Sequence, residues 1–407
     1  MPKRGLGLNV FDAANERISF TFDNFERIYL SFSAGKDSTV MLHMVAAEAR
    51  ERGRKIGVLM IDWECQIGLT IDFARAMFEE YADVIEPYWV ALPMKTWNAC
   101  SQIEPEWTAW DPEKKELWVR QADQLSITDE SFFPFYYTGM PFEEFTPAFA
   151  QWYADGKSCA CFVGIRADES LNRFRSIARD DKPKFEGKQW TTQVEGIAWN
   201  IYPIYDWHTK DIWRFHGKTG LPYNRLYDRM HQAGMKISQM RICEPFGDEA
   251  RKGLWLYQIV DPAMWAKVVL RCAGANTGKM YSQEKGAVMG NHSIALPEGH
   301  TFESFAKHIL RTMPKPTSQH YRNKLAVYLK WWSKRGYPDG IPDSADKSLE
   351  SRGKVPTWRK IVKTFLKNDY WCKGLGFSPT KSAAYQQYCE LMKRRRAEWK
   401  IDSVENL

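Results

Sequence analysis

The segment SAGKDST, residues 33–39, combines residue types that can bind a phosphate group. Gly35 has no side chain, so backbone amides can close around an anion at this point. Lys36 adds a full positive charge, and Asp37 could cap a following helix or hold Mg²⁺. Their combination suits the pyrophosphate part of a nucleotide. The residues expected to contact the phosphates are Ser33, Ala34, Gly35, Lys36, Asp37, Ser38 and Thr39.

A second group of candidate anion ligands lies at residues 164–175. Arg166 would stand at the end of a strand, and Arg173 would lie one or two turns into the next helix. Two guanidinium groups placed in this way can clamp a phosphate or a sulfate. The simpler alternative is that both arginines pair with Asp168 and Glu169.

Buried strands and helices alternate around these two segments. Apolar runs predict strands at 27–33, 56–61, 84–90 and 158–165, and helices are expected at 37–52 and 71–81. This alternation predicts an α/β fold with a parallel sheet and right-handed crossovers. The phosphate segment then lies between a strand and the N-terminus of a helix, where backbone amides and the helix dipole favour an anion.

Two regions depart from this alternation. Residues 95–157 are rich in aromatic residues, and we interpret them as an insertion with its own small core that could cover the site. Beyond residue 250 the pattern predicts helices at 261–272, 301–312, 319–334, 356–366 and 381–400. Residues 336–356 hold several Gly and Pro residues and predict a loop or linker. We therefore expect a nucleotide-binding domain over residues 1–250 and a mostly helical, basic domain over residues 251–407.

Positive charge is concentrated towards the C-terminus. The formal net charge is +7, but residues 304–407 carry +13 and the preceding residues carry −6. Such asymmetry favours a C-terminal part that faces a polyanion. The cluster Lys393, Arg394, Arg395 and Arg396, close to Trp399, suits contact with nucleic-acid phosphates and stacked bases. Alternatively, these side chains form the solvated face of an amphipathic helix.

Composition narrows the class of protein. With 44% hydrophobic residues, the chain can bury a core and is not expected to be disordered. No apolar run approaches the roughly 20 residues of a membrane span, and the first residues lack the apolar core of a signal peptide. Eight cysteines in 407 residues are too sparse for a disulfide scaffold. We expect a cytoplasmic protein of two or three domains with reduced thiols.

The phosphate segment is not a Walker A loop, which needs G-x-x-x-x-G-K-[ST]. Its S-x-G-K-D-S form resembles the PP-loop of the adenine-nucleotide alpha-hydrolase superfamily, which includes ATP pyrophosphatases, tRNA-thiolating enzymes and phosphoadenosine-phosphosulfate (PAPS) reductases. Further segments resemble the PAPS reductase branch: Asp62-Trp63-Glu64, Gly164–Ser170 (GIRADES) with Arg173, Pro203–Trp213 and Leu221–Tyr227. The resemblance implies that Asp62 lies near the adenosine and that the arginines meet phosphate or sulfate. It also implies that the last two segments form a floor for the site.

Residues 241–249 (RICEPFGDE) and 368–375 (NDYWCKGL) resemble a narrower group, the immunoglobulin-binding-regulator A proteins of phages and mobile elements, which carry a DUF3440 region. This resemblance would cover nearly the whole chain, and it implies a ParB-like protein partner. Arg241, Cys243 and Glu244 would belong to a loop over the nucleotide. Such a loop could bind substrate or Mg²⁺, or its acidic residues could merely cap the next helix.

The chain departs from PAPS reductases at the nucleophile. Those enzymes carry a catalytic cysteine in a C-terminal E-C-G-[IL]-H motif, whereas Cys372 and Cys389 of this chain stand in other contexts. Without that motif, the phosphate segment and Arg166 favour chemistry at the alpha-phosphate of ATP. An acceptor oxygen would attack and pyrophosphate would leave, while Lys36, Arg166 and Mg²⁺ stabilise the charge.

Three functions therefore stay open. The leading one is a Mg²⁺- and ATP-dependent enzyme that adenylates or modifies a nucleic acid or a partner protein. The first alternative is a PAPS reductase that uses Cys243 or an external thiol, and the second is a nucleotide-sensing regulator that binds nucleic acid. Cys159 and Cys161, two apart on a strand, could join Cys243 in a metal site, although small buried residues are common on strands. His208 could act as an acid or a base.

Overall fold

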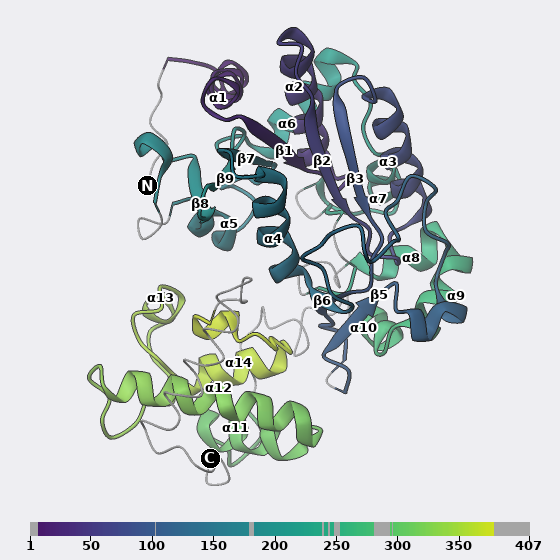
Figure 1. The fold of residues 1–407 in the computed structure, drawn as a ribbon. Helices are drawn as coiled ribbons and strands as arrows, with labels where there is room; N and C mark the ends of the chain where they lie inside the picture. Colours follow the sequence, from purple (N-terminus) through teal and green to yellow (C-terminus); the bar gives the residue numbers. More distant parts are fainter. Residues whose placement is uncertain are drawn as a thin grey trace.

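The computed structural model describes residues 7–101, 103–178, 183–237, 240–242, 245–247, 253–280, 294 and 296–377. Its centre is a six-stranded sheet in the order β3-β2-β1-β7-β9-β8 (Figure 1). The strands are β1 (Arg27–Ser31), β2 (Ile56–Ile61), β3 (Ile85–Val90), β7 (Cys159–Val163), β8 (Thr191–Glu195) and β9 (Ala198–Ile201). Neighbouring strands pair in parallel except for β8, which runs antiparallel to β9 at the edge. The predicted α/β fold with a parallel sheet is confirmed.

The strand order reverses between β1 and β7. The chain proceeds from β1 outward through β2 to β3, and then returns to place β7 on the other side of β1. The last residues of the two strands are in register, with Ser31 opposite Val163. In open parallel sheets such a reversal creates a crevice at the carboxyl ends of the strands, where ligands bind. Both predicted anion-binding segments follow these two strands directly.

Helices pack on both faces of the sheet, and strand residues alternate between the two faces. On one face Leu30 and Phe162 join a core with α1 (Val10–Asn24), α2 (Lys36–Glu51), α3 (Gly68–Glu80) and α6 (Thr209–Thr219). On the other face Tyr29 and Cys161 join a second core with α4 (Phe142–Ala154) and α7 (Leu226–Gln232). A short helix, α5 (Leu171–Ile177), follows β7.

The aromatic-rich insertion does not have a core of its own. It forms a small sheet, β5-β4-β6, from β4 (Met94–Trp97), β5 (Glu106–Ala109) and β6 (Met140–Pro141), together with the turn η1 (Pro112–Leu117) and α4. Its buried Trp107, Phe133 and Phe145 belong to the same core as Tyr29 of β1. This differs from the expectation because the aromatic rings pack against the sheet face rather than against one another alone.

The domain boundary expected near residue 250 does not coincide with the packing either. Three helices follow it: α8 (Trp255–Val260), α9 (Pro262–Arg271) and α10 (Ala275–Met280). Their residues Leu254, Trp265 and Val268 are buried in the core that also contains Tyr29. In the described part of the chain, residues 253–280 therefore pack as part of the nucleotide-binding half.

A separate helical unit follows, from residue 296 to residue 377. It contains α11 (Phe302–Thr312), α12 (Lys315–Ser333), α13 (Lys347–Ser351), α14 (Trp358–Leu366) and the turn η5 (Lys373–Leu375), around its own core. The predicted helices agree with α11, α12 and α14, and the predicted linker 336–356 contains α13. The helix expected at 381–400 lies outside the described residues. Asn368 joins the unit to the insertion, because its side-chain amide donates to the carbonyl of Ser101 at 2.8 Å.

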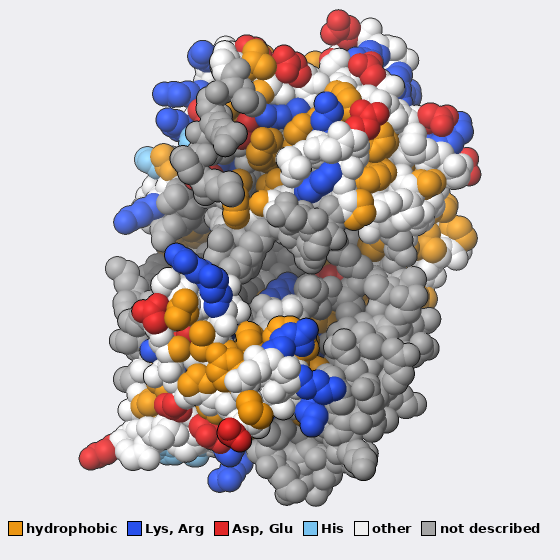
Figure 2. All heavy atoms as spheres, turned by 90° about the vertical axis from the view of Figure 1, so that its left-hand side faces the viewer, with side chains coloured by type: hydrophobic (Ala, Val, Ile, Leu, Met, Phe, Trp, Pro, Cys, Tyr) orange, Lys and Arg blue, Asp and Glu red, His pale blue; other side chains and the backbone are white. Residues whose placement is uncertain are grey.

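The surface of the helical unit mixes apolar and basic side chains. Figure 2 shows, in its lower half, a hydrophobic patch with Lys and Arg side chains beside it. Among the described residues, no helix combines the length and apolar character that crossing a membrane requires.

Candidate active site

The phosphate segment forms a tight loop between β1 and α2. Gly35 is the N-cap of α2, and Ala34 before it has a φ of +56°. A non-glycine residue rarely adopts this left-handed conformation and persists there only when its surroundings fix it. The fixing contact is made by Asn224, a fully buried residue whose side-chain amide donates to the Ala34 carbonyl at 3.1 Å. The hydroxyls of Ser33 and Ser38 lie 3.1 Å apart.

The first turn of α2 is held from the side by the segment that precedes and begins α7. The backbone amide of Lys36 donates to the hydroxyl of Tyr227 at 3.0 Å. The hydroxyl of Thr39 turns inward and donates to the Gly35 carbonyl at 2.8 Å. Asn224 and Tyr227 thus contact the loop directly, as the floor assigned to Leu221–Tyr227 requires. The buried hydroxyl of Thr39 therefore stabilises the backbone of the loop through the Gly35 carbonyl.

Asp37 lies between two cations that come from different parts of the chain. Its Oδ2 is 3.0 Å from the ammonium group of Lys36, and its Oδ1 accepts a hydrogen bond of 2.5 Å from Nε of Arg166. Burial disfavours the charged carboxylate, but the charges of Lys36 and Arg166 outweigh it and lower the pKa of Asp37. The carboxylate therefore stays ionised within the cluster Lys36–Asp37–Arg166.

Arg166 is positioned by the close approach of β7 to α2. At Gly164 a Cβ atom would lie 3.0 Å from the backbone of Asp37 and Ser38, so a larger residue would push these two segments apart. This contact brings Arg166 beside α2, where the residue is 1% exposed. Its Nη1 atom is buried and has no hydrogen-bond partner. A buried, unsatisfied guanidinium N–H calls for an explanation, and a bound anion would supply one.

Arg173 and Arg241 form a second cluster beside the first. Nε of Arg173 is 3.0 Å from the carboxylate of Glu169, and Nη2 of Arg241 donates to the Glu169 carbonyl at 2.9 Å. The alternative of simple pairing thus holds for Arg173, whereas Arg166 pairs with Asp37 instead of Asp168. Arg241 lies next to Met240, whose carbonyl accepts from the Lys36 ammonium at 3.3 Å. The predicted substrate loop therefore reaches the phosphate loop, but Cys243 and Glu244 lie outside the described residues.

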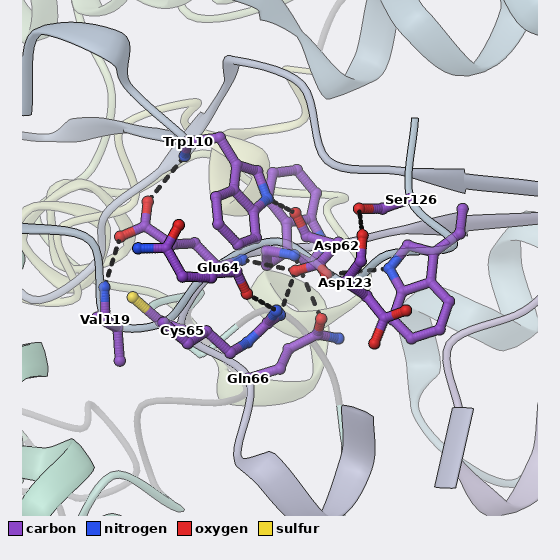
Figure 3. Close-up of polar contacts among 12 residues, drawn as sticks. Asp62, Glu64, Cys65, Gln66, Trp110, Val119, Asp123 and Ser126 are labelled. Carbon is purple, nitrogen blue, oxygen red and sulfur yellow. Dashed lines mark hydrogen bonds and ion pairs between the residues drawn. The ribbon is translucent and has the colours of Figure 1, made fainter. Parts of the chain in front are cut away.

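Asp62 stands at the carboxyl end of β2, at the same edge of the sheet. Its carboxylate accepts from the indole N–H of Trp89 at 3.0 Å, from the Glu64 amide at 2.9 Å and from Arg120 (Figure 3). Glu64, fully buried and with a φ of +56°, pairs with Arg271 of α9 through two bonds of 2.8 and 2.9 Å. These two carboxylates anchor the insertion and α9 to the end of β2, and the role of Asp62 near adenosine stays a prediction.

The remaining sequence candidates are placed as follows. Cys159 and Cys161 point to the same face of β7 and are buried in its core, where burial raises the pKa of each thiol to about 12. Among the described residues, no three His, Cys, Asp or Glu side chains gather in a group that could hold a metal ion. His208 pairs with Asp168 at 2.9 Å, and both are partly exposed. Lys393, Arg394, Arg395 and Arg396 lie outside the described residues.

Two families match consecutive parts of the chain. Residues 27–242 match the family described as "Phosphoadenosine phosphosulfate reductase domain", which is more than half of the 407 residues. The chain belongs to this family. A second family, described as "Domain of unknown function (DUF3440)", matches residues 234–342 and 337–386. These matches confirm the predicted resemblance to PP-loop, PAPS reductase-like proteins and the predicted DUF3440 region.

One relative matches nearly the whole chain. The chain is 46% identical over 399 residues to "Uncharacterized protein YbdN" of Escherichia coli (strain K12), with 97% of each chain covered. Among solved structures it is similar to an FMN adenylyltransferase of Candida glabrata in complex with FMN and an ATP analogue, at 14% identity and a TM-score of 0.33. That match covers 54% of this chain and 59% of the other. A PAPS reductase of Candida auris in a phosphate complex matches at 15% identity and a TM-score of 0.30, over 56% of this chain and 93% of the other.

Proposed function

We propose that the chain is an enzyme of the PP-loop class that binds ATP and cleaves it between the alpha and beta phosphates. An acceptor oxygen attacks the alpha-phosphate, so that a bond to the acceptor forms while the bond to the beta-phosphate breaks and pyrophosphate leaves. The acceptor belongs to a nucleic acid or a partner protein. The proposal agrees with the family of the chain, whose members include nucleotide-using proteins, and goes beyond it in naming the reaction.

The observation that carries the proposal is the buried cluster Lys36–Asp37–Arg166 at the N-terminus of α2. Its two cations and one carboxylate leave a net positive charge beside the first amides of a helix, which is a favourable place for a polyphosphate. The unpartnered Nη1 of Arg166 provides a donor in a water-poor site. Donors of this kind stabilise charge that develops on a phosphate during transfer.

A reductase reaction needs a thiolate close to the nucleotide. Burial raises the pKa of the thiols of Cys159, Cys161 and Cys372, and all three lie in packed cores. These three thiols therefore stay protonated and suit packing better than catalysis. The reductase remains the second candidate because of the family match to residues 27–242, and Cys243 is then the residue to replace.

The described residues do not fit a protein-held Mg²⁺ site. Both oxygens of Asp37, the ligand expected from the sequence, face cations, and no three described His, Cys, Asp or Glu side chains form a group that could hold a metal ion. The ATP-dependent proposal above therefore assigns the stabilising roles to Lys36, Arg166 and the helix N-terminus.

The deciding experiment compares ligands on the purified chain. Thermal stabilisation is measured with ATP, a non-hydrolysable ATP analogue, PAPS and adenosine 3′,5′-bisphosphate, each with and without Mg²⁺, because a ligand that binds the native state raises its melting temperature. Pyrophosphate release from ATP and sulfite release from PAPS are then measured. We expect a shift with ATP and pyrophosphate release. A shift confined to PAPS and the bisphosphate, with sulfite release that Cys243→Ser abolishes, would establish the reductase instead.

Two variants test whether the named residues carry the binding. Lys36→Ala and Arg166→Met should each remove most of the ATP-induced shift, because each deletes a cation from the cluster. Lys307→Ala is the matched control, since Lys307 pairs with Glu303 on α11 of the helical unit. Binding of ATP without any turnover in the presence of nucleic acid or protein acceptors would favour the nucleotide-sensing regulator.

A further inference from the structure

We infer that Asp37 is a positioning residue that holds Arg166 and Lys36 in place, and that it is not a ligand of a divalent cation. This inference rests on the proposed function, since it concerns the same site. It differs from the sequence-based expectation, in which Asp37 was a candidate for binding Mg²⁺.

The first argument is that each oxygen of Asp37 already faces a cation. Oδ1 accepts from Nε of Arg166 and Oδ2 faces the Lys36 ammonium, at 2.5 and 3.0 Å. The Asp37 side chain is only 14% exposed, which leaves little room for a hydrated ion. Mg²⁺ demands six oxygens in an octahedron at about 2.1 Å and keeps several waters. A divalent cation bound to either oxygen would lie within a few ångströms of a Lys or Arg charge and would be repelled by it.

The second argument is what Asp37 does to Arg166. A guanidinium group is planar and carries five N–H donors in a fixed fork, so fixing one nitrogen fixes the directions of the others. Asp37 binds Nε and so determines where Nη1 points, and Nη1 is the buried atom that lacks a partner. Gly164 allows this arrangement because it lets β7 come within contact of the Asp37 backbone. Asp37 therefore fixes the direction of the unpartnered Nη1 donor instead of contacting a ligand itself.

The third argument concerns Lys36. Its ammonium is held by Asp37 on one side and by the carbonyl of Met240 on the other, and it lies 5.4 Å from the centre of the Tyr227 ring. Three fixed neighbours restrict a side chain that is otherwise flexible. The cluster is therefore organised before a nucleotide arrives, which reduces the reorganisation that binding and transfer require.

The test is Asp37→Asn, compared with Asp72→Asn as a matched control on the surface of α3, where Asp72 is 67% exposed. ATP affinity and the rate of pyrophosphate release are measured over a range of Mg²⁺ concentrations. We expect Asp37→Asn to lower the rate by roughly 100-fold, a typical effect of misplacing a reacting group. The Mg²⁺ concentration for half-maximal rate should stay within about 2-fold of the wild-type value, because no ligand of the metal is lost. A rise of 10-fold or more in that concentration, with the rate restored at high Mg²⁺, would overturn the inference.

A second measurement needs no nucleotide. Melting temperatures are compared for the wild type, Asp37→Asn, Arg166→Met and the double variant. If Asp37 is bound to Arg166, Asp37→Asn should lower the melting temperature of the Arg166→Met variant by about half or less of what it costs the wild type. The reason is that the effects of coupled residues are not additive. Fully additive losses would overturn the inference. If the wild type released no pyrophosphate, the proposed function would fail while this cycle still decided the role of Asp37.

Discussion

Replacing Arg271 with methionine should strongly destabilise the chain, because it leaves the carboxylate of Glu64 buried without its cation. The Glu64 side chain is fully buried and the Arg271 side chain is 2% exposed, and two bonds of 2.8 and 2.9 Å join them. Among the described partners of Glu64, the backbone amides of Trp110 and Val119 would remain, at 2.7 and 3.3 Å. Removing one partner of a buried ion pair costs about 3–5 kcal/mol. For a large chain, roughly 2 °C of melting temperature corresponds to each kcal/mol, so the expected loss is roughly 6–10 °C.

The assay is thermal unfolding followed by circular dichroism, with two companion variants. Arg50→Met removes an exposed pair with Asp83 on the surface of α2 and should change the melting temperature little, because exposed ion pairs contribute little. The double variant Glu64→Gln with Arg271→Met removes both charges and should recover part of the loss, since the glutamine oxygen can accept from one of the two backbone amides, Trp110 or Val119. The reasoning would be refuted if Arg271→Met cost no more than Arg50→Met, or if the double variant were no more stable than Arg271→Met.

Three further predictions concern the surroundings of the site. Gly164→Ala should lower the free energy of unfolding by about 1–3 kcal/mol and abolish ATP-induced stabilisation, because its new methyl group meets the backbone of α2 at 3.0 Å. The control Gly217→Ala, in open space on α6, should leave the free energy of unfolding unchanged or raise it slightly. Denaturant unfolding measures both. Tyr227→Phe should lower the free energy of unfolding by about 1 kcal/mol and weaken ATP binding, since the backbone amide of Lys36 loses its acceptor. Calorimetric titration measures the change in ATP affinity. Burial lowers the pKa of His43 to about 4 in the folded chain. As the pH drops from about 6.5 to 4, the unfolded chain therefore binds a proton that the folded chain does not, and the free energy of unfolding should fall by up to about 3 kcal/mol. His43→Gln should reduce the slope of that part of the melting-temperature profile without removing it, because burial also lowers the pKa of His320 to about 4. An unchanged profile would contradict the assignment.

Much of the fold follows from local patterns in the sequence. The apolar runs of β1, β2, β3 and β7 were predictable because a strand buried on both faces is a continuous apolar segment. The loop at 33–39 was predictable because phosphate binding at a helix N-terminus has a local signature of glycine, lysine and hydroxyl residues. The helices α11, α12 and α14 follow from their amphipathic periodicity.

The contacts that complete the site could not be predicted in this way. The pairing of Asp37 with Arg166 joins residues 129 positions apart, and it depends on how closely β7 approaches α2. The pairing of Glu64 with Arg271 joins residues 207 positions apart. Neither partner has a local signal beyond its charge, although Gly164 and the Leu221–Tyr227 segment hinted at close contacts. The aromatic insertion was misjudged because composition shows that rings will be buried but does not show against which surface.

The position of α8, α9 and α10 has a consequence for dividing the chain experimentally. A fragment that stops at residue 250, or where the reductase-domain match ends at residue 242, would strip Leu254, Trp265 and Val268 from the core around Tyr29 and would remove the cation that neutralises Glu64. Such a fragment would expose apolar surface and carry an unneutralised carboxylate at the end of β2, and it should be recovered as insoluble or aggregated material. A fragment that keeps residues 253–280 would retain this packing. Residues 253–280 fall within the first DUF3440 match, residues 234–342, so exchanging that region between relatives would also replace part of the core around Tyr29.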